Sequence, residues 1–99
     1  MTTTVERRDD AHGLAKTLVE GAAAACVQVV GPIVSHYRWQ GKTQQSSEYL
    51  LVVKTTAERA DATVASIVEA HPYEVPEVLV TPVVGGHDPY LRWVTENVG

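Results

Sequence analysis

The stretch ACVQVVGPIVSHYRWQGKTQQSSEYLLVVKT, residues 25–55, predicts one long β-hairpin. Its first arm runs over 25–30, is interrupted at Gly31-Pro32, and resumes over 33–39. Proline donates no backbone hydrogen bond, so the interruption predicts a bulge or an edge position. Gln40-Gly41 is suited to a two-residue turn. The returning strand runs from Lys42 to Thr55, with the apolar run 49–53 at its buried centre.

Amphipathic segments on either side of the hairpin predict three helices. In the first, Asp9 or Asp10 is the expected cap and Gly21 the stop. Its apolar face carries Ala11, Leu14, Ala15, Leu18 and Val19 at helical spacing. A second helix is expected over 57–70, ended by Pro72, with an inner stripe of Ala60, Val64, Ile67 and Val68. A last helix over 88–98 is expected to turn Tyr90, Leu91, Val94 and Val98 inward.

Two short strands complete the pattern, one over residues 1–5 and one over 77–81, between two prolines. The order is therefore β-α-β-β-α-β with a C-terminal helix, which is an α+β, ferredoxin-like pattern with a short first strand. The apolar residues include 17 valines and no phenylalanine, which favours a sheet. A chain of 99 residues predicts a single domain over 1–99.

The composition excludes several classes of function. A net charge of −4 argues against a nucleic-acid or anionic-membrane partner. There is no apolar stretch of the roughly 20 residues that a membrane span needs, and the polar N-terminus is unlike a secretory signal. A lone cysteine closes no intrachain disulfide. We therefore expect a cytoplasmic protein, and the absence of a nucleophile–base pattern or a phosphate-binding loop predicts no enzyme.

Four motifs and the stretch Pro89–Trp93 resemble the CutA divalent-cation tolerance family, in the same order over about residues 9–94. The motifs are Ala24-Ala25-Cys26-Val27, Tyr37-Arg38-Trp39-Gln40-Gly41-Lys42, Glu48 with Lys54-Thr55-Thr56, and His71-Pro72-Tyr73-Glu74-Val75-Pro76-Glu77. The resemblance implies a ferredoxin-like protomer, a homotrimer akin to the PII signal-transduction proteins and a bacterial cytoplasmic location. It also implies a non-catalytic role in the response to metal ions, which in some members is linked to copper.

His71 is the candidate metal ligand, for copper or another divalent cation; no other cofactor is expected. In copper-linked members the resemblance implies a first-strand cysteine and two adjacent histidines, whereas this sequence has Thr2 or Thr3 there and the pair Ala70-His71. We therefore favour the alternative that His71 closes its helix and hydrogen-bonds nearby backbone or a neighbouring subunit. Cys26 is expected to be a small buried residue rather than a soft copper ligand.

Eight residues are candidates for an inter-subunit cleft or interface: Tyr37, Trp39, Lys42, Glu48, Lys54, Tyr73, Tyr90 and Trp93. In one interpretation Lys42 and Trp39 hold a small anionic or planar ligand. In the favoured one, Trp39 anchors an interface and Gly41 supplies the positive φ of the turn. Glu48 and Lys54 share one strand face, and an ion pair with another strand is expected.

The hairpin also predicts assembly. Arms of about 14 residues would reach about 45 Å, whereas a domain of this size is about 30 Å across. Exposed strand edges would then pair between protomers in a closed ring. We expect a homotrimer with main-chain bonds from the hairpin and the 77–81 strand. Two other functions stay open: a PII-like ligand-sensing module, and a small metal-dependent enzyme using His71, Glu74 and Lys42.

Overall fold

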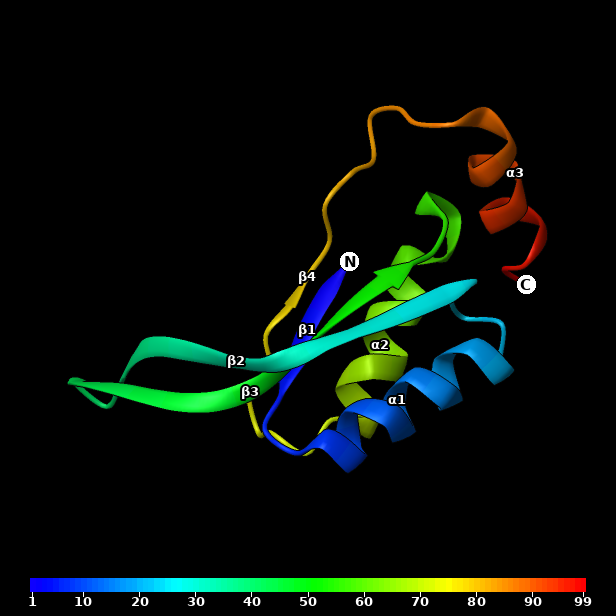
Figure 1. The fold of residues 1–99 in the computed structure, drawn as a ribbon. Helices are drawn as coiled ribbons and strands as arrows, with labels where there is room; N and C mark the ends of the chain where they lie inside the picture. The colour runs from blue at the N-terminus through cyan, green and yellow to red at the C-terminus, as the bar shows by residue number, and fades with distance from the viewer.

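A computed structural model describes all 99 residues as a four-stranded antiparallel sheet with helices (Figure 1). The strands are β1 (Thr2–Val5), β2 (Cys26–Trp39), β3 (Lys42–Lys54) and β4 (Val78–Leu79). The helices are α1 (Arg8–Glu20), α2 (Ala60–Ala70), preceded by the 3₁₀ turn η1 (Ala57–Arg59), and α3 (Asp88–Glu96). The sheet order is β2-β3-β1-β4. This confirms the predicted α+β, ferredoxin-like order with a short first strand at its centre.

The core lies between the sheet and the pair α1 and α2, which cover one sheet face (Figure 1). The sheet contributes alternate, odd-numbered residues, Val5, Leu51 and Val53, all at most 1% exposed. Leu18 of α1 and Ile67 of α2 pack against them. Because side chains alternate along a strand, the even-numbered residues of β1 and β3 occupy the opposite face. That face is called the open face below.

The β2–β3 hairpin extends well beyond the helices (Figure 1). The molecule measures 44 × 25 × 22 Å along its principal axes, and its longest dimension matches the length expected for the hairpin arms. At the tip, Gln40 and Gly41 have φ values of 50° and 77°. Positive φ at both positions is what a tight turn between twisted strands requires, so the predicted turn is confirmed.

The predicted interruption of β2 is a bulge within one continuous strand. Val30 lies opposite Leu50, and the next pair is Ile33 with Glu48. An advance of three residues along β2 thus matches an advance of two residues along β3, so β2 contains one extra residue. The extra residue reverses the alternation, so Ile33 and the odd-numbered residues after it point to the open face, as Val30 does.

Two helix starts differ from the sequence prediction. Helix α1 begins at Arg8, and its N-cap residue Arg7 makes no side-chain capping bond. Asp9 and Asp10 lie within the first turn instead, where their charges still favour the helix dipole. The second helix begins as the 3₁₀ turn, in which the Thr56 hydroxyl accepts a hydrogen bond from the Arg59 N–H at 3.3 Å.

The inner face of α2 also differs from the predicted stripe. Thr63 and Ile67 are buried, whereas Val68 is 48% exposed. The Thr63 hydroxyl donates to the Ala23 carbonyl at 2.9 Å. The same carbonyl also accepts a hydrogen bond from the Thr55 hydroxyl at 2.8 Å. The inward Thr63 hydroxyl is therefore satisfied, which offsets the cost of its burial.

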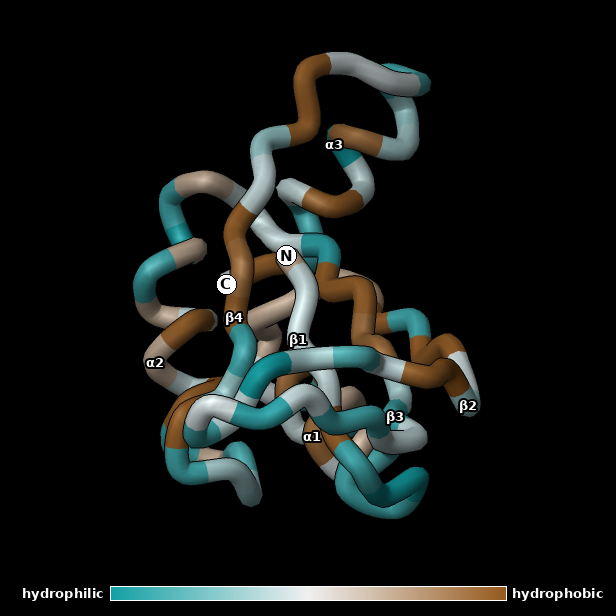
Figure 2. The backbone as a smooth tube through the Cα atoms, turned by 90° about the vertical axis from the view of Figure 1, so that its left-hand side faces the viewer, coloured by the Kyte–Doolittle hydropathy of each residue, from teal (hydrophilic) through white to brown (hydrophobic).

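The C-terminal region is less tightly packed than the sequence predicted. Of the predicted strand over 77–81, only Val78 and Leu79 pair with β1, opposite Thr3 and Thr2. In α3, Val94 alone is buried, and Tyr90 is 42% exposed. Figure 2 shows hydrophobic residues along the segment between β4 and α3, where Val83 and Val84 are exposed.

Candidate functional site

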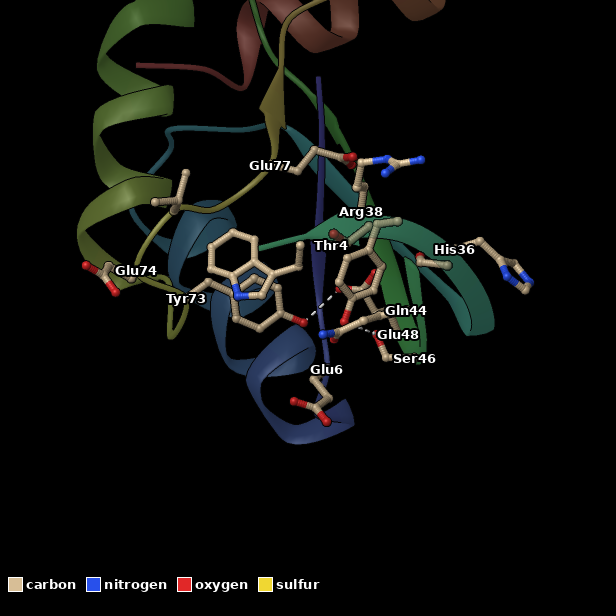
Figure 3. Close-up of a pocket in the computed structure, with 14 residues that line it drawn as sticks. Thr4, Glu6, His36, Arg38, Gln44, Ser46, Glu48, Tyr73, Glu74 and Glu77 are labelled. Carbon is tan, nitrogen blue, oxygen red and sulfur yellow. Dashed lines mark hydrogen bonds between the residues drawn. The ribbon is translucent and has the colours of Figure 1, made fainter. Parts of the chain in front are cut away.

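A cavity of about 730 Å³ lies on the open face, between the outer half of the hairpin and the segment after α2 (Figure 3). We call it the trough. Its lining comes from the hairpin, from the end of β1 and from residues 73–77: Thr4, Glu6, Ser35, His36, Tyr37, Arg38, Trp39, Gln44, Ser46, Glu48, Tyr73, Glu74, Val75 and Glu77.

The hairpin contributes to the trough because of its register. Gln44, Ser46 and Glu48 alternate along β3 on the open face. Tyr37 lies directly opposite Gln44, and the Ser46 hydroxyl donates to the Tyr37 hydroxyl oxygen at 3.2 Å. Without the bulge in β2, the Tyr37 side chain would point to the other face of the sheet.

A hydrogen-bonded pair, the buried Glu48 and the partly buried Tyr73, forms the floor of the trough. Glu48 is only 7% exposed, and the Tyr73 hydroxyl donates to its Oε2 at 2.7 Å. Burial raises the pKa of Tyr73, and the hydrogen bond and negative charge of Glu48 raise it further. The phenol therefore keeps its proton and acts as a donor. No donor of the chain reaches the second Glu48 oxygen, Oε1.

His71 holds this part of the trough in place. It is the C-cap residue of α2, and its Nε2 lies 2.9 Å from the Thr4 carbonyl oxygen of β1. Its Nδ1 accepts a hydrogen bond from the Tyr73 N–H at 3.1 Å. Since Nδ1 accepts, Nε2 carries the proton and donates to Thr4. Burial lowers the pKa of His71, against the opposing effects of the Thr4 bond and of the Asp10 and Glu48 charges.

The structure brings half of the eight candidate residues together. Tyr37, Trp39, Glu48 and Tyr73 all line the trough. Lys42 begins β3 at the hairpin tip and Lys54 ends the same strand, both outside the lining. Tyr90 and Trp93 lie on α3 and stack on each other, with ring centroids 5.7 Å apart.

Two expectations about individual side chains are corrected. Lys54 donates to the Gln28 side-chain oxygen at 2.7 Å, and Glu48 accepts from a tyrosine, so neither forms the expected ion pair within the chain. Cys26 is partly exposed rather than buried. It lies opposite Lys54 at the start of β2, on the open face.

Sequence reasoning missed several residues of the trough, among them Thr4, Glu6, Gln44 and Ser46. A signal for two of them was present in the sequence. Gln44 and Ser46 alternate with Glu48 along a predicted strand and therefore share its face. Thr4 and Glu6 carried no such signal, because only the pairing of β1 beside β3 brings them to the cavity.

The described side chains show no ready-made metal centre. No group of three or more histidine, cysteine, aspartate or glutamate side chains is placed so that it could hold a metal ion. In addition, none of the helices is both long and apolar enough to cross a membrane.

Comparisons with known proteins agree with one another. The family model described as CutA1 divalent ion tolerance protein matches residues 1–97. The divalent-cation tolerance protein CutA of Thermus thermophilus is 42% identical over 96 residues, which cover 97% of this chain and 93% of that relative. A chloroplastic CutA protein of Arabidopsis thaliana is 41% identical over 95% of this chain, which spans about half (52%) of that relative.

A solved structure shows the same fold. The divalent cation tolerance protein Cut A1 of Thermus thermophilus superposes with a TM-score of 0.95 at 41% sequence identity. The match covers 99% of this chain and 95% of the other. Sequence and fold therefore coincide over nearly the whole length of both chains.

Proposed function

The chain belongs to the CutA1 divalent ion tolerance family, and from this premise we propose that it is a non-catalytic homotrimer acting in the response to divalent metal ions, copper among them. The observation that carries the proposal is the match of family model and fold over almost all residues. We further propose a cytoplasmic location. The Arabidopsis relative is described as chloroplastic, so the compartment differs between members.

Exposed apolar residues on the open face support the trimer. Val30 of β2 and Leu79 of β4 are 46% and 56% exposed, and neither α1 nor α2 covers them. Large exposed apolar side chains on an uncovered sheet face are typical of an interface between subunits. In a closed ring each protomer covers exposed apolar residues on part of a neighbour's open face, without open-ended growth.

The segment after β4 supports pairing between strands of different protomers. Among the backbone hydrogen bonds outside helices and strands, none involves residues 80–86. Such an extended edge is a template for another strand. We propose that this segment and the projecting hairpin exchange main-chain hydrogen bonds between protomers.

We propose that His71 is structural and that the metal response does not depend on it as a ligand. Both of its ring nitrogens already have partners within the chain. A Cu(II) ion would have to displace the Tyr73 N–H or the Thr4 carbonyl to reach a lone pair. Copper binding is therefore expected to be no tighter than at an ordinary exposed histidine.

Two measurements test this proposal. Light scattering at micromolar concentration should give about 32 kDa, three times the 10.7 kDa of one chain; a monodisperse monomer would contradict the trimer. In a Cu(II) titration against a competing chelator, His71→Ala should leave the affinity unchanged. Loss of a tight, stoichiometric copper site in that variant would show that His71 is a ligand.

A second candidate function is small-ligand sensing of the PII-like kind, which the trough favours. Its volume of about 730 Å³ lies within the usual range of ligand sites. Its lining combines three aromatic side chains with several polar groups. The third alternative, a metal-dependent enzyme using His71, Glu74 and Lys42, gains no such support, because Lys42 lies outside the trough.

A further inference from the structure

We propose that the trough binds a guanidinium group, with Glu48 as its anionic anchor and Tyr37 and Trp39 as its aromatic walls. The inference names the ligand chemistry for the ligand-sensing candidate described above and rests on that candidate alone. It replaces the small anionic ligand considered from the sequence with a cation.

The first argument is charge. Four carboxylates, those of Glu6, Glu48, Glu74 and Glu77, line the trough, and the only lysine or arginine in the lining is Arg38. In Figure 3 the Glu74 side chain extends away from the Glu48–Tyr73 pair, and so does that of Arg38. For Arg38 this follows from its place on β2, where alternation turns it to the opposite side from Tyr37. The resulting negative field repels anions and attracts cations.

The second argument is the unfilled hydrogen-bonding capacity of Glu48. The Glu48 residue is 7% exposed, and Tyr73 supplies the single side-chain hydrogen bond of its carboxylate, to Oε2. Oε1 has no partner within the chain and is not one of the buried unpaired side-chain atoms, which are Thr3 Oγ1 and Arg59 Nε. It is therefore open to the trough and free to accept a hydrogen bond from a ligand. An N–H group carrying positive charge is the strongest partner for it.

The third argument is the aromatic wall. Trp39 is 49% exposed and Tyr37 is 40% exposed in the single chain, and both line the trough together with Glu48. Aromatic faces attract cations, tryptophan most strongly. A guanidinium group is planar and can stack on such a face while its N–H groups bind a carboxylate in the same plane. A compact ammonium group is not planar, so it cannot stack on the aromatic face and bind the carboxylate well at the same time.

The probe that tests the proposal is methylguanidinium, titrated into the intact protein and followed by NMR. The two indole N–H signals serve as reporter and internal reference, since Trp39 lines the trough and Trp93 lies on α3. We expect a saturable shift of the Trp39 signal and none for Trp93. Methylurea, which is planar but neutral, and inorganic phosphate should leave Trp39 unchanged. An absent Trp39 shift, or an equal shift with either control, would overturn the proposal.

Two matched variants test whether Glu48 is the anionic anchor of the guanidinium group. Glu48→Gln keeps the shape but removes the charge, and should weaken methylguanidinium binding about tenfold or more. Glu58→Gln makes the same change on η1, outside the trough, and should bind as the parent does. If Glu48→Gln proves poorly folded, Trp39→Leu tests the stacking wall and should weaken binding about threefold, measured by calorimetry. Undiminished affinity in a folded Glu48→Gln or Trp39→Leu protein would refute the assignment.

Light scattering during the same titration identifies where the guanidinium comes from. If the trough receives an arginine side chain of a second copy, methylguanidinium competes with it and lowers the mass of the assembly. If it receives a free small molecule, the Trp39 signal shifts at constant mass. Either result together with the Trp39 shift supports the proposal. A protein that is monomeric before any addition would contradict the trimer but leave this test intact.

Discussion

At the scale of single residues, His71 connects three parts of the chain. It ends α2, donates to the Thr4 carbonyl of β1, and accepts from the Tyr73 N–H. Its ring also packs against the Tyr73 ring at 4.8 Å between centroids. Because Tyr73 in turn donates to Glu48, one buried imidazole positions the floor of the trough.

We expect His71→Ala to lower the free energy of unfolding by about 2–4 kcal/mol, because the buried Thr4 carbonyl and the partly buried Tyr73 N–H lose their partner and a cavity is left. Chemical denaturation at fixed protein concentration measures this. His36→Ala, at an exposed position of β2, is the control and should change stability by less than about 0.5 kcal/mol. Equal effects at the two positions would contradict the connecting role of His71.

The same residue predicts a pH dependence of stability. Burial lowers the pKa of His71 in the folded protein, so between that value and the unfolded value of about 6.5 the unfolded chain binds more protons. The free energy of unfolding should therefore fall as the pH drops through this window. His71→Phe removes the titrating group and should flatten the dependence between about pH 7 and pH 5. An unchanged slope would show that other groups cause it.

At the scale of elements, the bulge at Gly31 and Pro32 controls what the hairpin presents. It reverses the side-chain alternation of β2, which is why Tyr37 and Trp39 reach the same face as Glu48. Gly31 is held close to β3 there. A Cβ atom on it would lie 2.7 Å from Cδ1 of Tyr49 and 3.1 Å from the Glu48 carbonyl oxygen.

We expect Gly31→Ala to destabilise the protein by about 1–3 kcal/mol, because backbone atoms of β3 would have to move. The matched control is Gly13→Ala in α1, where a Cβ atom would meet nothing within 4 Å. That change should stabilise the protein by about 0.5–1 kcal/mol, through helix propensity. Thermal or denaturant unfolding compares the two. Gly31→Ala at parent stability would argue against a tightly held bulge.

At the scale of the whole molecule, the two faces of the sheet differ in whether helices cover them. Helices α1 and α2 bury one face (Figure 1), whereas the open face keeps exposed valine and leucine side chains. The hairpin projects past the helices and adds to this uncovered surface. The proposed trimer is the arrangement that would cover it.

A pair of valine substitutions tests this view. Val30 on the open face and Val68 on α2 are 46% and 48% exposed, so the same change can be made at matched exposure. Val30→Glu should dissociate the assembly, because a charge would be buried in the interface. Val68→Glu should leave its mass unchanged. Sedimentation velocity at micromolar concentration measures both, and an intact trimer in Val30→Glu would place the interface elsewhere.

Local physics explains which features the sequence could predict. The hairpin, its turn at Gln40-Gly41 and the bulge at Gly31-Pro32 follow from strand propensity and from proline and glycine chemistry, which act between neighbours in the chain. The helix over 57–70 was also predictable, and so was the burial of Ile67, but the burial of Thr63 in place of Val68 was not. The Thr63 hydroxyl donates to the Ala23 carbonyl, a partner 40 residues away in the sequence.

The trough depends on contacts that no local pattern encodes. The residues of β3 that enter it were predictable from alternation, since Glu48, Ser46 and Gln44 share a face. The pairing of β1 beside β3 places Thr4 and Glu6 there, and His71 and Tyr73 reach it through hydrogen bonds to residues far away in sequence. The ferredoxin-like order could thus be derived from the chain alone, because its elements arise from neighbouring residues. Strand register and long-range hydrogen bonds, which exist only in the packed molecule, decided which side chains form the site.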